Sequence, residues 1–280
     1  MPVKKYEWTE AKFKKYLKEG RGQGTGKDYK PWLMTYNVPS HGRRARDPGW
    51  KTGRLHHLMS DHETYYFYLL EWSDLVIDIK EQFPLLNLEA AQAIAFDMGV
   101  EYPTDRHSKF PFVLTTDFMI TVRDGDRIFD IARTIKPSKE LEKTRVIEKF
   151  EIERRYWAAK GIDWGIVTEK EIPMILAKNI EYLHPAYHLE PTTETSLPQL
   201  LLIADLLKDR LKSSKKSIVE TITNFDNELR LLPGTCLKVF LHLVARKEIL
   251  LDMNQKINLT KSALTILKFA SRSEKGVKVA

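Results

Sequence analysis

The sequence predicts an α/β domain with a mixed β-sheet flanked by helices, followed by a mostly α, winged-helix-like C-terminal domain. Residues 112–137 have the pattern of two strands around an Asp-Gly turn, and a helical stretch and an apolar strand follow. Strand, crossover helix and strand form a βαβ unit, in which the two strands run parallel. The character changes after Thr168, where helical segments and a Pro- and Thr-rich connector begin. We therefore expect domains at 1–170 and 171–280.

The composition is that of a globular protein, with 42% hydrophobic and 30% charged residues in a chain of 280. No apolar run approaches the roughly 18 residues that cross a bilayer, so no membrane partner is expected. The first ten residues have no apolar stretch typical of a secretory signal. A single cysteine, Cys236, excludes an internal disulfide and a cysteine-based zinc site. These features predict a cytoplasmic protein.

Positive charge is concentrated at the start of the chain. Residues 1–60 contain fourteen Lys or Arg and five Asp or Glu, whereas the whole chain has a net charge of +7. Such a basic flank is typical of proteins that bind a polyanion such as DNA, although a solvated basic face would have the same composition.

In the first domain, periodicity predicts helices at 9–19, 55–72, 87–96 and 138–160, and strands at 75–79, 112–122, 127–137 and 162–168. The sequence Ser60-Asp61-His62-Glu63 fits a capping box, which places the start of the second helix proper near Asp61 and gives Glu63 a structural role. The glycine-rich residues 20–28 are not a Walker A loop, because Asp28 follows Lys27 where Ser or Thr belongs. We expect a flexible basic loop there that could follow a DNA backbone, and irregular chain at 29–51.

In the second domain we expect helices at 171–183, 199–212, 216–224 and 235–246, with a connector at 184–198. Residues 249–253 and 256–259 have the pattern of a small hairpin around Asn254-Gln255. Helices followed by a hairpin are consistent with a winged helix.

The hairpin at 112–137 carries possible chemistry. Thr134 and Lys136 lie two residues apart on the second strand and so share a face, and folding about the turn brings Asp117 opposite Ala132 or Arg133. A carboxylate, a hydroxyl and an ammonium on one face are the groups of a metal-dependent phosphodiesterase. Taken alone, this stretch fits a surface hairpin with scattered charges better.

Several longer stretches resemble one known family. They are KEGRGQGTGKDYKPWL, KTGRLHHLMSDHE, LLEWSDLVIDIKEQFPLL, TTDFMI and FEIERRYWAAKGIDW, within residues 18–164. The sequence is similar there to TnsA, the endonuclease subunit of heteromeric cut-and-paste bacterial transposases. The segment after residue 170 is less similar.

The resemblance implies a restriction-endonuclease-like catalytic domain with Glu63, Asp117 and Lys136 as catalytic residues. Glu63 and Asp117 would also bind the metal, together with the backbone carbonyl of Ile135. Thr134 stands where related nucleases carry Glu or Gln, so its hydroxyl would reach a metal only through water or after a small strand shift.

Glu153 matches a further acidic position linked to activity in the family, and a supporting role and a solvated helix charge are both open.

The resemblance also implies a function. It is hydrolysis of one DNA strand at the 5′ ends of the transposon, with Mg²⁺ as cofactor and Mn²⁺ as a substitute. Lys136 would either help deprotonate the attacking water or stabilise the transition state. The implied partners are transposon-end DNA, an end-binding transposase subunit that cuts the 3′ ends, and an ATP-dependent regulator that docks on the C-terminal domain.

Two other functions stay open. The chain could be a stand-alone restriction-type endonuclease that finds DNA through its own winged helix. It could also be a DNA-binding assembly subunit with a decayed site, and Thr134 is the residue that favours this interpretation.

Overall fold

The structure, a computed structural model, describes residues 7–37 and 44–269. The chain forms two compact units, Met1–Ile172 and Pro173–Ala280. The prediction that the N-terminus lacks a secretory signal falls partly on residues 1–6, outside the described residues. Within the described ranges, no helix combines the length and the apolar character needed to cross a bilayer.

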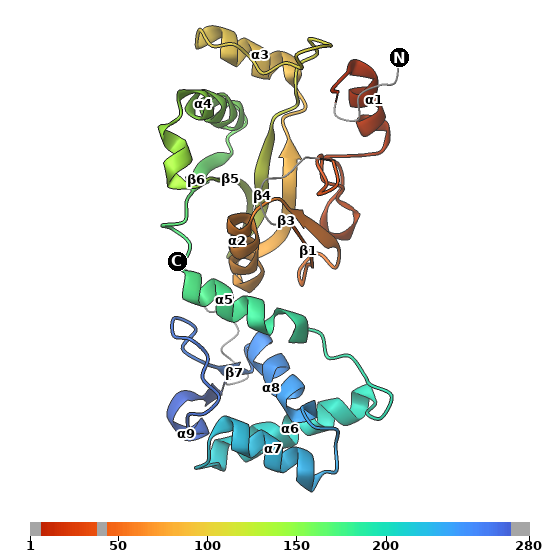
Figure 1. Ribbon diagram of the computed structural model, residues 1–280, viewed down its shortest axis with the longest axis vertical. Coiled ribbons are helices and arrows are strands. Elements are labelled where there is room, and N and C mark those ends of the chain that lie inside the picture. The colour runs from red at the N-terminus through yellow and green to blue at the C-terminus, as the bar shows by residue number, and fades with distance from the viewer. Residues whose placement is uncertain (1–6, 38–43, 270–280) are drawn as a thin grey trace. The chain divides into compact units, whose positions relative to one another are not determined.

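The first unit is built on a four-stranded sheet in the order β3-β4-β5-β6 (Figure 1). The strands are β3 (Val76–Pro84), β4 (Thr115–Asp124), β5 (Arg127–Ile135) and β6 (Asp163–Val167). The first two pairings are antiparallel and the last is parallel. The mixed sheet, the hairpin and the βαβ unit are therefore confirmed, whereas β3 runs five residues beyond the predicted end at Ile79.

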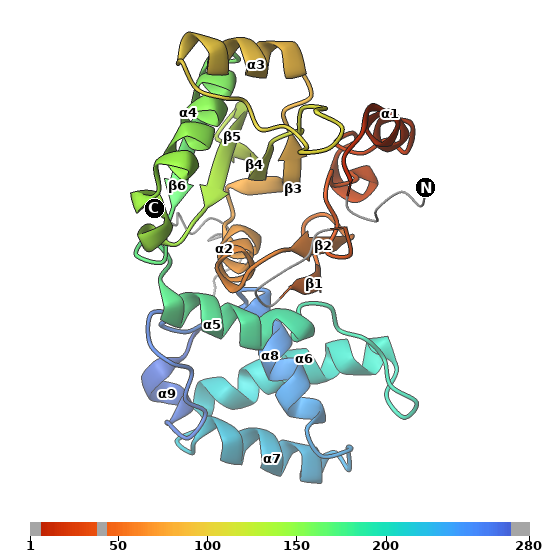
Figure 2. The ribbon, with the colours of Figure 1, turned by 45° about the horizontal axis from the view of Figure 1, so that its top comes forward.

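Helix α4 (Thr144–Ala158) lies along the sheet, and Figure 2 shows α3 (Leu88–Asp97) across the upper end of the unit, next to α4. A buried apolar cluster joins them to the strands through Met119, Ala132, Ile152 and Trp157. The predicted start of α4 at Ser138 is wrong, because Ser138 donates its backbone N–H to Glu169 and begins the short 3₁₀ turn η2 (Ser138–Glu142).

The prediction of one helix over 55–72 is wrong at its start. Residues Leu55–Leu58 form strand β2, which pairs with β1 (Ala45–Pro48), and helix α2 begins at Asp61 and ends at Trp72. The buried His56 side chain donates from Nδ1 to the Glu81 carboxylate, 2.8 Å away, and this contact holds the segment extended along β3. The expectation of irregular chain at 29–51 is accordingly wrong for β1.

The glycine-rich loop follows helix α1 (Glu10–Lys18) and contains the 3₁₀ turn η1 (Gly26–Asp28). It is anchored rather than flexible, contrary to the prediction. The Gly26 N–H donates to Asp78 Oδ2 at 3.1 Å, and the guanidinium of Arg54 donates to the Gly26 carbonyl at 3.2 Å. A Cβ on Gly22, where φ is +74°, would meet Pro84 Cγ at 2.3 Å, so glycine is required at this contact with β3.

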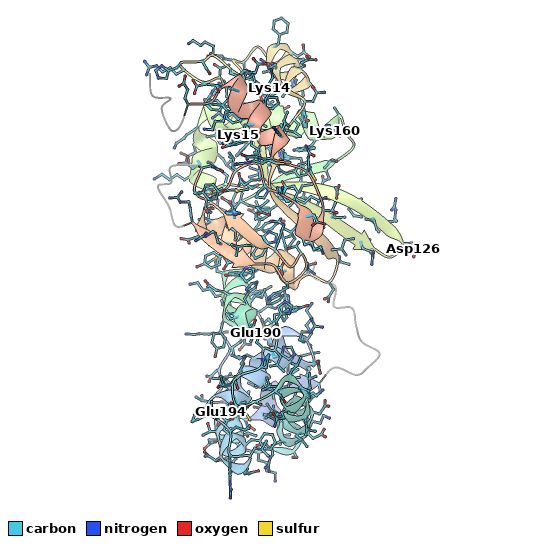
Figure 3. All side chains as sticks on the ribbon, turned by 90° about the vertical axis from the view of Figure 1, so that its right-hand side faces the viewer. Lys14, Lys15, Asp126, Lys160, Glu190 and Glu194 are labelled. Atoms are coloured by element: carbon cyan, nitrogen blue, oxygen red, sulfur yellow. The ribbon has the colours of Figure 1, made fainter. Side chains whose placement is uncertain are left out.

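The hairpin of β4 and β5 extends beyond the part of β5 that pairs with β6, and Figure 3 shows Asp126 at its tip. Its base is deeply buried around Phe118 and Ile120, both 0% exposed. The base therefore forms part of the core, whereas the tip faces solvent.

The second unit is mostly helical. Its elements are α5 (Met174–Leu183), η3 (His184–Ala186), α6 (Leu197–Ser213), α7 (Ile218–Glu228), α8 (Thr235–Ala245), β7 (Ile249–Leu250), α9 (Ala263–Ile266) and β8 (Lys268–Phe269).

The predicted hairpin over 249–259 is wrong, because β7 pairs with β8 instead. The buried Asn179 side chain donates to the carbonyls of Met253 and Gln255 and accepts the Ile257 N–H, so these backbone groups are already bonded to α5.

Candidate active site

Glu63 lies in the first turn of α2 and is 6% exposed. One carboxylate oxygen accepts from the Ser60 hydroxyl at 2.9 Å and the other from the Met59 N–H at 2.9 Å. The Ser60 hydroxyl in turn accepts the Glu63 N–H at 3.2 Å. Ser60 therefore caps α2 and the helix begins at Asp61, as predicted, but the second bond of a capping box differs, because Glu63 accepts the N–H of Met59 rather than that of Ser60. These contacts fix the Glu63 carboxylate at the N-terminal end of α2.

Asp117 lies on β4, near the point where the hairpin joins the core. The predicted pairing of Asp117 with Ala132 or Arg133 is wrong, since Phe118 is opposite Arg133 and Met119 is opposite Ala132. Asp117 therefore lies opposite Thr134, and its Oδ2 accepts the N–H of the next residue, Ile135, at 2.7 Å. The backbone of Ile135 and the carboxylate of Asp117 thus lie in direct contact.

A residue that sequence reasoning missed joins the two carboxylates. The Nε2 of Gln82, on β3, lies 3.2 Å from Asp117 Oδ1 and 3.5 Å from Glu63 Oε2. Gln82 is 4% exposed and has a φ of 49°, a left-handed value that is uncommon outside glycine. The available signal was three successive polar residues, Lys80, Glu81 and Gln82, within one strand.

Burial is the main cause of the shifted pKa values of the carboxyl groups at this site. It raises the pKa of both Glu63 and Asp117 above the ordinary carboxyl range, and the charge of Asp117 raises the pKa of Glu63 further. Lys136 acts against this, since its positive charge lowers the pKa of Asp117. Lys136 directly follows β5, and its N–H donates to the Val167 carbonyl at 2.9 Å.

Thr134 and Glu153 form a second buried cluster behind this pair. One Glu153 carboxylate oxygen accepts from the hydroxyl of Thr134 at 2.5 Å, that of Thr116 at 2.6 Å and the Trp164 indole N–H at 2.8 Å. Burial raises the pKa of Glu153 to about 7, and the charge of Asp117 contributes to the increase. The alternative of a solvated helix charge at Glu153 is therefore wrong, because the residue is 4% exposed.

The sequence-predicted residues thus fall into two groups. Glu63, Asp117, Ile135 and Lys136 surround one locus, and Thr134 is directed away from it toward Glu153. In the part of the chain that the structure describes, no group of three or more His, Cys, Asp or Glu is arranged to hold a metal. Two carboxylates beside the backbone of Ile135 nevertheless fit a hard cation such as Mg²⁺, which keeps several water ligands and needs few from protein.

A buried ionic network supports this locus from β3. The Glu81 carboxylate, 0% exposed, accepts from Arg54 Nη1 at 2.8 Å and from the His57 N–H at 3.0 Å, and lies 2.8 Å from His56 Nδ1. Burial alone would raise the pKa of Glu81, but the charges and hydrogen bonds of His56 and Arg54 hold it well below its usual range. The network therefore fixes the residue that precedes Gln82.

Comparison with known proteins gives this geometry a family. Residues 73–169 match the family model described as TnsA-like endonuclease N terminal, and residues 171–253 match TnsA endonuclease C terminal. The chain is 44% identical over 203 residues to the Transposon Tn7 transposition protein TnsA of Escherichia coli, a match that covers 72% of each chain. The chain belongs to the TnsA family.

The resemblance drawn from the residues is therefore confirmed. The TnsA endonuclease match includes Asp117, Thr134, Lys136 and Glu153, whereas Glu63 precedes its first residue. This TnsA-type endonuclease subunit carries both parts of the family, and the boundary of its two compact units, between Ile172 and Pro173, lies close to the junction of the two matches.

Proposed function

We propose that this chain is a metal-dependent DNA endonuclease that hydrolyses one strand at the 5′ ends of a transposon during excision. A partner transposase subunit would cut the 3′ ends. The observation that carries the proposal is a pair of carboxylates, the buried Glu63 and the half-buried Asp117, which converge on the amide of Gln82 beside Lys136 in an endonuclease of the TnsA family.

Each residue of the locus has a role in this proposal. Glu63, Asp117 and the Ile135 carbonyl hold Mg²⁺, for which Mn²⁺ substitutes. When bound, the metal supplies Lewis-acid stabilisation of the negative charge that develops at the phosphoryl group. Lys136 is close enough to Asp117 to lower its pKa. Its side chain either takes a proton from the attacking water as a free amine or stabilises the transition state as an ammonium.

Glu153 acts as a positioning residue. Because it accepts hydrogen bonds from the hydroxyls of Thr116 and Thr134, it ties β4 and β5 to α4 next to Asp117 and Ile135. The position of the catalytic carboxylate then depends on a buried side chain that touches neither DNA nor metal.

The proposal extends to the fold of each domain. For residues 1–170 we propose a restriction-endonuclease-like fold, supported by Asp117 and Lys136 on or directly after neighbouring strands of a mixed sheet. For residues 171–280 we propose a winged-helix-like domain, supported by helices α6 to α8 and the short β7–β8 pair.

The partners follow from the two domains. The positively charged first sixty residues favour transposon-end DNA as the ligand of the catalytic domain, and an end-binding transposase subunit would deliver the site to its target. For the C-terminal domain we propose an ATP-dependent regulator subunit, because α6 exposes the leucines Leu197, Leu201, Leu202 and Leu206.

A reconstituted excision reaction tests the catalytic proposal. The full chain, the partner transposase, the regulator and transposon-end DNA are combined with Mg²⁺, and cleavage of each strand is mapped separately. We expect Asp117→Ala to abolish 5′-end cleavage while 3′-end cleavage continues. Asp130→Ala, which changes the same residue type on the same hairpin outside the site, should retain both cuts.

The outcomes separate the three functions considered from the sequence. Loss of 5′ cleavage in Asp117→Ala alone supports the transposase subunit. Cutting of defined short sites by the isolated chain would instead identify a stand-alone restriction-type enzyme. No 5′ cleavage in the wild type would leave an assembly subunit with a decayed site. Unchanged 5′ cleavage in Asp117→Ala would rule out the proposed catalytic residues.

A binding measurement tests the regulator proposal. We expect Leu202→Asp, on the exposed face of α6, to weaken capture of the full chain by the regulator at least tenfold. Val219→Asp on α7, also at an exposed apolar position, is the matched control. Equal capture of both variants would assign the docking surface elsewhere.

A further inference from the structure

Gln82 occupies the position toward which the two acidic side chains converge. Its Nε2 donates to Asp117 Oδ1 at 3.2 Å and approaches Glu63 Oε2 at 3.5 Å, while its Oε1 accepts from the Thr115 hydroxyl at 3.2 Å. The side chain is 4% exposed, so water does not compete freely for these contacts. The amide N–H₂ thus lies where two carboxylates favour positive charge.

If the Gln82 side-chain amide were rotated so that Oε1 and Nε2 exchange places, Gln82 would offer a metal ligand in place of a hydrogen-bond donor. A half-turn about the last side-chain torsion places Oε1 where Nε2 lies, facing Asp117 and Glu63. With a cation between the carboxylates, an oxygen at this position is attracted rather than repelled. The Thr115 hydroxyl both donates and accepts, so it serves either orientation of the Gln82 amide.

The backbone supports a functional role for Gln82. A φ of 49° in a residue with a side chain is strained, and such strain persists only where the surroundings fix it and clusters at functional sites. The Gln82 carbonyl accepts the Trp32 N–H at 3.2 Å, and the preceding residue, Glu81, is held by the Arg54 and His56 network.

The other neutral side chain considered as a metal ligand is already engaged. The Thr134 hydroxyl donates to Glu153 at 2.5 Å and accepts from the Trp164 indole at 3.3 Å. Release of Thr134 toward Asp117 would leave the buried Glu153 carboxylate with fewer donors, which is unfavourable.

We propose that Gln82 is a metal ligand through Oε1, and that it supplies the side-chain oxygen that Thr134 does not supply. In the metal-free protein the same side chain holds the carboxylates of Glu63 and Asp117 in place through Nε2. The inference rests on the proposed metal site at these two residues and adds a ligand to it.

Titration with Mn²⁺ alone, followed by electron paramagnetic resonance of the free ion, tests the inference in the full chain. We expect Gln82→Met, which has similar length but no amide, to weaken Mn²⁺ binding at least about tenfold. Gln92→Met, the same substitution at an exposed position of α3, should bind as the wild type does. Equal or tighter binding by Gln82→Met would overturn the inference, because a residue that only blocks the site would release it when removed.

Asp117→Ala in the same titration separates this inference from the proposed function. If Asp117→Ala loses Mn²⁺ binding and Gln82→Met does not, the proposed metal site is supported and the proposed role of Gln82 is refuted. If the wild type binds no Mn²⁺ either alone or with a DNA duplex added, or if Asp117→Ala binds Mn²⁺ equally well, both proposals are refuted.

A second measurement does not depend on the folding of a variant. In crystals of the wild-type chain grown with Mn²⁺ and located by anomalous scattering, we expect Gln82 Oε1 at a coordination distance of about 2.1 Å, as for Mg²⁺–oxygen contacts. A metal on Asp117 with the Gln82 amide outside its coordination sphere would overturn the inference.

Discussion

Glu81→Gln is expected to destabilise the first unit strongly, although the substitution preserves the shape of the side chain. Glu81 is 0% exposed and receives hydrogen bonds from Arg54 and His57 while lying 2.8 Å from His56 Nδ1. Loss of its charge leaves the buried guanidinium of Arg54 without its carboxylate. Removal of one partner of such a buried pair costs about 3–5 kcal/mol.

Urea unfolding followed by tryptophan fluorescence measures this effect in the correct unit. All six tryptophans precede residue 165, so the signal reports the first unit. Glu10→Gln is the matched control, since the Glu10–Lys14 pair is exposed and such pairs contribute no more than about 1 kcal/mol. A loss below about 1 kcal/mol in Glu81→Gln would refute the assigned role of the network.

The pH dependence of the unfolding free energy also tests the role of the Glu81 charge. The folded pKa of Glu81 is depressed, so the stabilisation is present above the unfolded pKa and is lost as the pH falls through the folded value. The difference in unfolding free energy between the wild type and Glu81→Gln should therefore narrow as the pH falls from 7 toward 3. If the difference in unfolding free energy stayed constant over this pH range, the charge of Glu81 would not be its cause.

Three further predictions concern other parts of the chain. Gly22→Ala should lower the unfolding free energy by more than Gly53→Ala. At both positions alanine would have to adopt a positive φ, which costs about 1–2 kcal/mol. A Cβ on Gly22 would also meet Pro84, whereas a Cβ on Gly53 would meet nothing within 4 Å. Burial raises the pKa of Glu71 to about 7. The unfolding free energy of the wild type should therefore fall by up to about 3 kcal/mol relative to that of Glu71→Gln as the pH rises from 4.5 to 8. Parallel profiles of unfolding free energy against pH would contradict this. Asn179→Ala should speed hydrogen exchange at the Ile257 amide severalfold, and unchanged exchange would show that the α5 contact does not hold this segment.

The elements predicted correctly depend on neighbours in sequence. The hairpin is specified by β-branched residues around Asp124-Gly125, and the start of α3 by the Asn87 cap, whose side chain accepts the Ala90 N–H at 3.0 Å. Each requires contacts only a few residues apart, which a local pattern describes.

The elements predicted wrongly depend on distant partners. Leu55–Leu58 is a strand because His56 contacts Glu81, 25 positions away, and the region around Met253 is not a hairpin because Asn179 binds its carbonyls. No local periodicity contains these contacts.

The same limit applies to the site. The sequence predicted Glu63, Asp117 and Lys136 through resemblance, but Gln82 joins Glu63 and Asp117 only when three segments of chain meet. The direction of Thr134 could also not be predicted, because it depends on the buried Glu153 of α4.

Calorimetric titration of the full chain with Mn²⁺, with and without a DNA duplex, tests the central claim of a metal site at Glu63 and Asp117 most directly. The account predicts binding by the wild type and none by Asp117→Ala, with Asp130→Ala, outside the site, unchanged. Absence of binding in the wild type under both conditions, or equal binding by Asp117→Ala, would contradict it.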